Sequence, residues 1–223
     1  DRKRGCFNTR WRPLNEPVFD TGGATPAVSA GVVCPVCSHD SFDDLSKSLV
    51  QCRECGFVLA DVPRDAESLL KLYGVGYFEG DEYADYLGDK KVYQKNLDRW
   101  LRIVRRYTPG GSLVEVGSAY GFFLELAQEH FDAFGYDVSE EAVRYANDVI
   151  GVHTRSHDFL SDDSLATGSV DAVAMWDLIE HVAKPDRFIE RSAEVLRPGG
   201  HLFLTTGDID SWLPRRQGLG WRL

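Results

Sequence analysis

The stretch SLVEVGSAYG, residues 112–121, decides the fold of this 223-residue chain. Its first residues form a short apolar strand pattern, and the glycine-bearing turn that follows leads into a helical pattern over residues 120–130. A strand that enters a helix through such a turn is the first unit of a nucleotide-binding α/β fold. The turn alone is a weak signal, because dinucleotides and other nucleosides both bind at turns of this kind.

Strand and helix patterns alternate after this unit. The segments 133–137, 152–158, 170–177 and 201–207 predict four more strands, and residues 139–150 and 186–196 predict helices. The run VDAVAMWD (170–177) is nearly continuous in apolar residues, as in a strand buried on both faces. The alternation predicts an α/β fold, with a Rossmann-like, doubly wound and mostly parallel sheet.

The turn itself departs from the dinucleotide fingerprint G-x-G-x-x-G. Ala119 replaces the middle glycine, and Phe122 stands where the third is expected. Glu115 adds a negative charge beside the turn. These features argue against a diphosphate and favour a ligand with a cationic end.

Further candidate ligand-binding residues lie at the carboxyl ends of the predicted strands, where ligands bind in this sheet type. Asp137, 20 residues after Gly117, can accept hydrogen bonds from both hydroxyls of a ribose. Asp158 offers an acceptor for an adenine amine, and Phe159 offers a ring for stacking. Trp176 ends the fourth strand.

On these motifs, residues 88–207 resemble class I S-adenosylmethionine-dependent methyltransferases. The glycine motif of that family matches Glu115, Gly117, Ala119 and Gly121, its ribose acid matches Asp137, and its adenine acid matches Asp158. The segments WDLIEHV (176–182) and LRPGG (196–200) are also typical of it. The resemblance implies S-adenosylmethionine as cofactor and methyl transfer to a small-molecule acceptor. Two alternatives stay open, an RNA methyltransferase and a non-catalytic module that binds the cofactor.

The resemblance also raises the question of a catalytic base. His181 follows the fourth strand and can titrate near neutral pH, so it is the candidate. Its alternative role is packing of the loop. Methyltransferases of this class usually have seven strands, and only five are predicted here, so we expect the domain to be incomplete at its C-terminus.

Four cysteines form a second motif ahead of this domain. Cys34-Pro-Val-Cys37 and Cys52-Arg-Glu-Cys55 are two C-x-x-C pairs, 14 residues apart. Two such turns can complete a tetrahedral S4 site, which predicts a zinc ribbon with a structural zinc ion. Disulfides, a redox pair and an iron–sulfur cluster are weaker alternatives.

These motifs divide the chain into four parts. Residues 1–33 read as a flexible tail, 34–60 as the zinc ribbon, 61–108 as a helical connector or lid, and 109–223 as the methyltransferase domain. The connector contains a predicted helix over residues 90–107. Four of its tyrosines, Tyr77, Tyr83, Tyr86 and Tyr93, are candidates for a lid over a cationic ligand, or alternatively for core packing.

The formal net charge of −10 disfavours broad nucleic-acid binding, although basic termini keep the RNA alternative open. The ribbon sets Lys47 and Arg53 against four acids, which is not a basic patch. No apolar run approaches the ~20 residues of a membrane span, and no secretory leader is evident. We therefore expect a soluble, cytoplasmic protein with a small-molecule partner and no membrane partner. The sequence does not indicate the oligomeric state.

Overall fold

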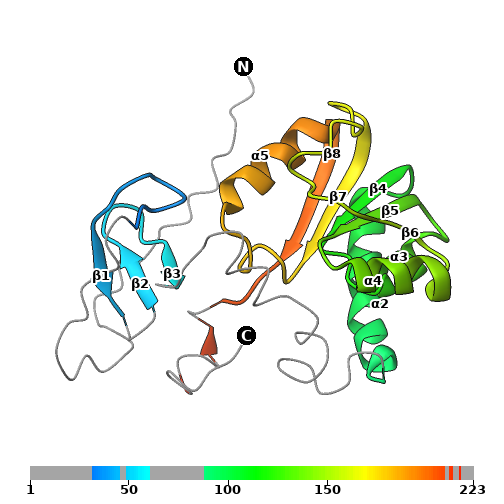
Figure 1. Ribbon diagram of the computed structural model, residues 1–223, viewed down its shortest axis with the longest axis horizontal. Coiled ribbons are helices and arrows are strands. Elements are labelled where there is room, and N and C mark those ends of the chain that lie inside the picture. Colours follow the sequence, from blue (N-terminus) through cyan, green and yellow to red (C-terminus); the bar gives the residue numbers. More distant parts are fainter. Residues whose placement is uncertain (1–31, 46–48, 61–87, 209–210, 213–215, 217–223) are drawn as a thin grey trace. The chain divides into compact units, whose positions relative to one another are not determined.

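A computed structural model describes residues 32–45, 49–60, 88–208, 211–212 and 216. The chain splits into two compact units, Asp1–Val62 together with Asp208–Leu223, and Pro63–Gly207. Figure 1 shows the elements of both units. Residues 1–31 of the predicted tail and the candidate lid residues Tyr77, Tyr83 and Tyr86 lie outside the described residues. The four-part division of the chain stays a prediction.

The N-terminal unit contains a three-stranded antiparallel sheet in the order β1-β2-β3. The strands are β1 (Phe42–Asp44), β2 (Leu49–Cys52) and β3 (Val58–Ala60). Each contributes one buried apolar side chain to a small core, namely Phe42, Val50 and Leu59. Two of the four motif cysteines, Cys34 and Cys52, complete that core, so the cysteine site and the sheet form one packed body.

The second unit is built on a five-stranded sheet in the order β6-β5-β4-β7-β8. Its strands are β4 (Ser112–Val116), β5 (Asp132–Asp137), β6 (His153–Ser156), β7 (Val170–Trp176) and β8 (Leu196–Thr205). All four pairings are parallel, which confirms the predicted sheet. The order changes direction at β4, which lies between β5 and β7. A ligand of this fold is expected at the carboxyl ends of those three strands.

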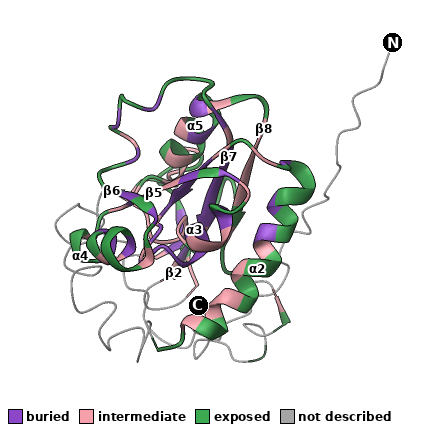
Figure 2. Ribbon diagram, turned by 90° about the vertical axis from the view of Figure 1, so that its right-hand side faces the viewer, coloured by how far each residue is buried: buried purple, intermediate pink, exposed green. Residues whose placement is uncertain are grey.

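Helices cover both faces of this sheet. They are α2 (Lys90–Tyr107), α3 (Phe122–Ala127), α4 (Glu140–Tyr145), a π-helix (Ala146–Ile150) and α5 (Pro185–Val195). Successive residues of β4 contribute to two separate hydrophobic cores. Leu113 packs with residues of α2 and α3, and Val114 packs with Val195 of α5. Figure 2 shows the buried strands between these helices.

Two elements differ from their predicted form. The single helix expected over 139–150 is an α-helix followed by a π-helical turn, which ends at Gly151 with φ of 81°. The fifth strand begins at Leu196 rather than at residue 201. Its register with β7 shifts between the pairs Val170–Leu196 and Ala172–His201, so the intervening residues form a bulge.

In the part of the chain that the structure describes, no helix has the length and apolar character needed to cross a bilayer.

Candidate functional site

The turn after β4 requires glycine at both ends. Gly117 has φ of 76°, and a Cβ atom there would lie 2.9 Å from Leu178 Cδ1. Gly121 has φ of 78°, and a Cβ atom there would lie 2.7 Å from Val152 Cγ2. Both the left-handed backbone and the close packing therefore exclude a side chain at these two positions.

The middle of this turn is tied to Asp137. Ala119 takes φ of 43°, an uncommon conformation for a residue with a side chain. Its backbone N–H donates a 2.7 Å hydrogen bond to Asp137 Oδ2, and the N–H of Ser139 donates one of 2.9 Å to Oδ1. Since a carboxylate oxygen has two lone pairs, each oxygen of Asp137 keeps the capacity to accept from a ligand hydroxyl.

A second carboxyl group lies beside Asp137. Glu115 is on β4, directly before the turn, and only 3% of its surface is exposed. Burial, and then the charge of Asp137, raise the pKa of Glu115 well above its usual value. Burial also raises the pKa of Asp137, against the effect of its backbone hydrogen bonds. Two acids are thus held in a dry environment where a cation would relieve the cost of their charge.

Glu115 also has an unused acceptor. Its Oε2 atom is buried and has no hydrogen-bond partner among the described residues. Its neighbours in register on β5 and β7 are Gly135 and Ala174, so both flanking side chains are small. A buried acceptor without a donor is rare in a native protein, and a bound ligand is one of its ordinary explanations. The residues present therefore fit a ligand with a positively charged group.

Trp176 lies at the end of β7, next to β4 in the sheet. Its ring stacks on Trp100 of α2 at 4.8 Å between centroids and meets the ring of Phe123 edge-on at 5.0 Å. The indole Nε1 is buried, and no described residue accepts a hydrogen bond from it. Two unsatisfied polar atoms, an acceptor on Glu115 and a donor on Trp176, thus occur on neighbouring strands at the edge where a ligand is expected.

The loop after β6 holds Asp158 and Phe159 differently. Asp158 is exposed, and its Oδ1 accepts a 3.0 Å hydrogen bond from the N–H of Leu160. The ring of Phe159 is only 2% exposed, with centroids 5.6 Å from Tyr136 and 6.1 Å from Phe188. Asp158 is therefore accessible to a ligand, whereas the Phe159 ring packs mainly against other protein rings. Their cofactor contacts stay predictions.

Sequence reasoning missed the group that holds this loop. Asp162 accepts hydrogen bonds from Tyr136 Oη at 2.7 Å and from Arg155 Nη1 at 3.1 Å. Arg191 of α5 donates to the carbonyl oxygens of Asp162 and Leu165 at 2.8 and 3.0 Å. These contacts join residues up to 29 positions apart. No local motif in the sequence signals them.

The segment after β7 begins with a strained residue. Asp177 has φ of 48°, and its Oδ1 accepts a 2.8 Å hydrogen bond from Thr205 Oγ1 of β8. Strained backbone of this kind is concentrated at functional sites. His181 follows in the same segment, half-buried, with its N–H donating to the Leu178 carbonyl at 2.9 Å. The proposed role of His181 as a base stays a prediction.

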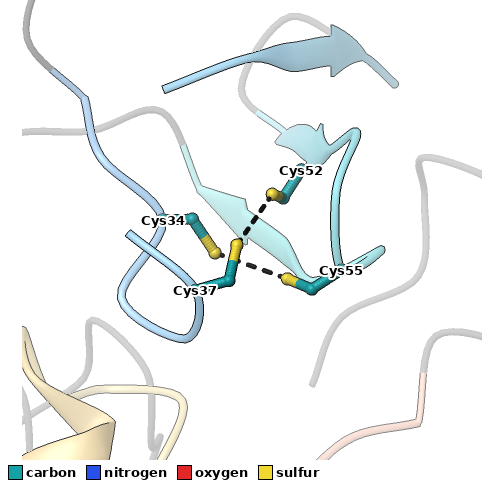
Figure 3. A group of neighbouring side chains, drawn as sticks. All are labelled: Cys34, Cys37, Cys52 and Cys55. Carbon is teal, nitrogen blue, oxygen red and sulfur yellow. Dashed lines mark hydrogen bonds between the residues drawn. The ribbon is translucent and has the colours of Figure 1, made fainter. Parts of the chain in front are cut away.

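The four cysteines of the N-terminal unit form a separate candidate metal site, shown in Figure 3. Their Sγ atoms all lie within 4.8 Å of one another. The Sγ atoms of Cys34 and Cys55 are 3.6 Å apart, and those of Cys37 and Cys52 are 3.5 Å apart. These separations are too long for a disulfide of about 2.05 Å. They are close to the edge of about 3.8 Å that follows from tetrahedral zinc with bonds of about 2.3 Å to sulfur.

The two C-x-x-C turns have matching backbone geometry. In each turn the residue after the second cysteine has a positive φ, 62° at Ser38 and 75° at Gly56. The N–H of that residue donates a 2.9 Å hydrogen bond to the carbonyl of the first cysteine, Cys34 or Cys52. The N–H of Cys55 is the main cause that lowers the pKa of the Cys52 thiol, to about 7. The two turns thus present their thiols to one centre, as a tetrahedral metal site requires.

Comparisons with known proteins identify the family of the second unit. A family described as a methyltransferase domain matches residues 89–223. A ubiquinone biosynthesis O-methyltransferase of Xanthomonas oryzae pv. oryzae is 33% identical over 104 residues, which cover 44% of this chain and 43% of that protein. The protein of the same name from Cupriavidus pinatubonensis is 31% identical over 104 residues, covering 44% of this chain and 41% of its own. The chain therefore spans less than half the length of these relatives.

Solved structures support the fold. A Thermotoga maritima protein named as a SAM-dependent methyltransferase and possible histamine N-methyltransferase has a TM-score of 0.51 and 23% identity, over 67% of this chain and 66% of that one. A protein from Pyrococcus horikoshii OT3 has a TM-score of 0.51 and 21% identity, over 56% of this chain and 63% of that one. With the family match over residues 89–223 and the parallel sheet described above, the chain belongs to the class I S-adenosylmethionine-dependent methyltransferases.

Proposed function

We propose that the protein transfers a methyl group from S-adenosylmethionine to a small-molecule acceptor. The observation that carries the proposal is the buried carboxyl of Glu115, whose Oε2 lacks a partner among the described residues, beside Asp137. S-adenosylmethionine supplies a positively charged sulfonium with a transferable methyl group. A buried acid next to a ribose-binding acid suits a cofactor that carries both a ribose and a positive charge.

The residues of this chain would bind and orient that cofactor. Asp137 would accept from the ribose hydroxyls with the lone pairs that Ala119 and Ser139 leave free. Asp158 would accept from the adenine amine, and the turn from Gly117 to Gly121 would bring the backbone close to the ligand. The stacked rings of Trp100 and Trp176 would exclude water from the buried side of the site. Positioning of this kind supplies much of the rate acceleration of a bimolecular transfer.

The acceptor must lose a proton if it is a hydroxyl group, and His181 is the residue proposed to take it. A catalytic role predicts that His181→Ala lowers turnover by about 10²–10⁴-fold while cofactor affinity is retained. A packing role predicts lower stability with turnover preserved in the folded protein. Thermal unfolding and turnover measured on the same preparation separate these two roles.

One observation supports a hydroxyl group as the acceptor, and a second disfavours RNA. The relatives cited above are named O-methyltransferases of ubiquinone biosynthesis. The ribbon does not offer a basic surface for RNA, since Arg53 is paired with Asp43 at 2.7 Å and the described ribbon also contains Asp40, Asp44 and Glu54. An RNA methyltransferase and a non-catalytic binding module remain as the alternative outcomes of the test.

The test is transfer of an isotope-labelled methyl group from S-adenosylmethionine. The acceptors are a panel of hydroxylated aromatic compounds and, separately, total RNA. Label on a phenolic oxygen that is lost in Asp137→Ala supports the proposal. Label on RNA alone contradicts it, and cofactor binding without transfer to any acceptor favours the binding module.

We further propose that Cys34, Cys37, Cys52 and Cys55 hold a structural zinc ion. Four thiolate ligands fill a tetrahedral site, so no position is left for a water molecule or substrate. The zinc would therefore stabilise the ribbon and take no part in the transfer. A zinc site of this kind needs reduced cysteines, which agrees with the proposed cytoplasmic location.

A further inference from the structure

The solvent face of α2 is unusually basic for an acidic protein. The helix carries seven Lys and Arg residues against one acid, Asp98, while the whole chain has a net charge of −10. Five exposed cations follow one another at steps of three or four residues and therefore form one stripe along the helix. This stripe, called the basic stripe below, consists of Lys91, Lys95, Arg99, Arg102 and Arg106. At a rise of about 1.5 Å per residue it is about 22 Å long.

Four of these five cations form no ion pair with another described residue. Arg102 pairs with Asp98 at 3.0 Å, whereas no ion pair involves Lys91, Lys95, Arg99 or Arg106 within the described ranges. Lys90 differs, because it lies toward the domain and pairs with Glu125 of α3 at 2.7 Å. The basic stripe is thus a set of exposed cations, of which only Arg102 is paired within the part of the chain that the structure describes.

An apolar row runs beside the basic stripe on the same helix. Val92, Ile103 and Tyr107 are 61%, 45% and 57% exposed. Val92 and Ile103 are about three helical turns apart, so they lie in line beside the cations and apart from the buried Leu101 and Val104. Tyr107 lies one turn beyond Ile103, and its ring centroid is 6.4 Å from that of Phe203 in β8. The exposed surface of α2 therefore combines a stripe of cations with apolar side chains near the two ends of the helix.

We propose that this surface of α2 docks on an anionic lipid membrane. Basic side chains bind lipid phosphates, and each contributes to attraction toward a negatively charged leaflet. The apolar row would enter the boundary between headgroups and acyl chains, as in helices that lie in the membrane interface. Single-stranded nucleic acid fits less well, because the side chains beside the cations are aliphatic except Tyr107, and base stacking needs aromatic rings. The expectation of no membrane partner rested on the lack of a spanning segment, which does not bear on surface docking.

Docking through α2 would also orient the candidate site. In the first turns of α2, Lys90 and Gln94 contact Glu125 of α3 at 2.9 and 3.0 Å. The same Lys90 lies over the ring of Phe122, the residue that follows the glycine turn, at 5.2 Å. The basic stripe therefore starts close to that turn. This orientation rests on the proposed function, whereas the docking itself does not.

The test is co-sedimentation of the whole chain with two kinds of vesicle, pure phosphatidylcholine and an equal mixture of phosphatidylcholine and phosphatidylglycerol. The expected result is binding to the anionic vesicles alone, weakened by added salt. The triple variant Lys91→Gln, Lys95→Gln and Arg99→Gln should bind about a hundredfold more weakly, since each cation near such a surface contributes roughly fivefold. A control triple, Arg144→Gln, Lys184→Gln and Arg187→Gln, removes the same charge from other exposed positions of this unit and should bind as the parent does.

A second variant separates lipid from nucleic acid. Val92→Ser with Ile103→Ser leaves every charge in place and should weaken vesicle binding several-fold because it removes the apolar row. Equal loss of binding in both triple variants, no binding to anionic vesicles, or binding to RNA but not to vesicles would each overturn the proposal. Cofactor affinity measured on the same variants tests the proposed function separately, and it should not change in the triple variant.

Discussion

The Tyr136 hydroxyl donates a 2.7 Å hydrogen bond to Asp162 Oδ2, and this bond joins the strand that ends in Asp137 to the loop that contains Asp158. Asp162 is 7% exposed. Hydrogen bonds from Ser164, Tyr136 and Arg155 hold its pKa well below the usual range. The two acids proposed to bind ribose and adenine are therefore held in place by a third, ionised acid that need not touch the ligand.

Tyr136→Phe should weaken this connection without creating a cavity. It removes one hydrogen bond to a charged group, so the free energy of unfolding should fall by about 1.5–3 kcal/mol in a urea titration. Tyr107→Phe, which alters an exposed tyrosine, should leave the unfolding midpoint unchanged. Equal stability of both variants would show that the buried hydroxyl does not stabilise the loop.

The acid of β4 should destabilise the ligand-free protein at high pH. Burial raises the folded-state pKa of Glu115. Because the folded-state pKa is the higher one, the contribution of Glu115 to stability is complete below its unfolded-state pKa of about 4.3. This contribution is lost as the pH rises through the folded-state pKa. Glu115→Gln cannot ionise, so its melting temperature should exceed that of the parent at about pH 9 and approach it at about pH 5.

Glu129→Gln is the matched control, because Glu129 is exposed. Its melting temperature should follow that of the parent at every pH. If Glu115→Gln also followed the parent throughout, the buried carboxyl would carry no penalty. Glu115 would then have no need of a cationic ligand.

The glycine turn can be tested with a substitution that separates strain from packing. Gly117→Ala forces a side chain into a left-handed conformation and against Leu178, whereas Gly168→Ala, with φ of 66°, meets nothing within 4 Å. Gly168→Ala should lower the free energy of unfolding by about 1–2 kcal/mol through backbone strain alone. Gly117→Ala should lower the free energy of unfolding further. It should also weaken binding of S-adenosylhomocysteine, which calorimetry can measure. Equal costs would contradict the close packing at Gly117.

The zinc site predicts a metal content near one zinc ion per chain. Cys34→Ser or Cys52→Ser should lose the metal and unfold the ribbon, because metal binding supplies much of the folding free energy of such small sites. Cys6→Ser changes a cysteine outside the two pairs and should retain the zinc. Elemental analysis that finds no zinc, or finds iron in equal amount, would contradict the assignment.

The arrangement of the sheet was predictable because it depends on local patterns. The central strands β4 and β7 are short apolar runs, and the glycine turn marks the first strand-to-helix unit. The predicted start of α4 has a local cause too, since Ser139 Oγ accepts from the N–H of Ala142 at 3.3 Å. Local hydrogen bonds of this kind follow from residue type and position alone.

What escaped prediction depends on contacts between distant residues. The π-helical turn before Gly151 and the bulge that starts β8 depend on register and packing, which hydrophobic periodicity does not specify. The packing of the Phe159 ring against Tyr136 and Phe188 likewise depends on residues distant in the sequence. The basic stripe on α2 is readable in the sequence, but its exposure is known only once the opposite face is packed.

Asp137 tests the central claim most directly, through the affinity for S-adenosylhomocysteine measured by calorimetry. Asp137→Ala removes the proposed acceptor for two ribose hydroxyls, so affinity should fall at least about tenfold, since each hydrogen bond to a charged group is worth about 1.5–3 kcal/mol. Asp132→Ala changes an exposed acid at the other end of the same strand and should bind as the parent does. NAD should not bind to either protein. Tight binding of NAD, or unchanged affinity of a folded Asp137→Ala variant, would contradict the site described here.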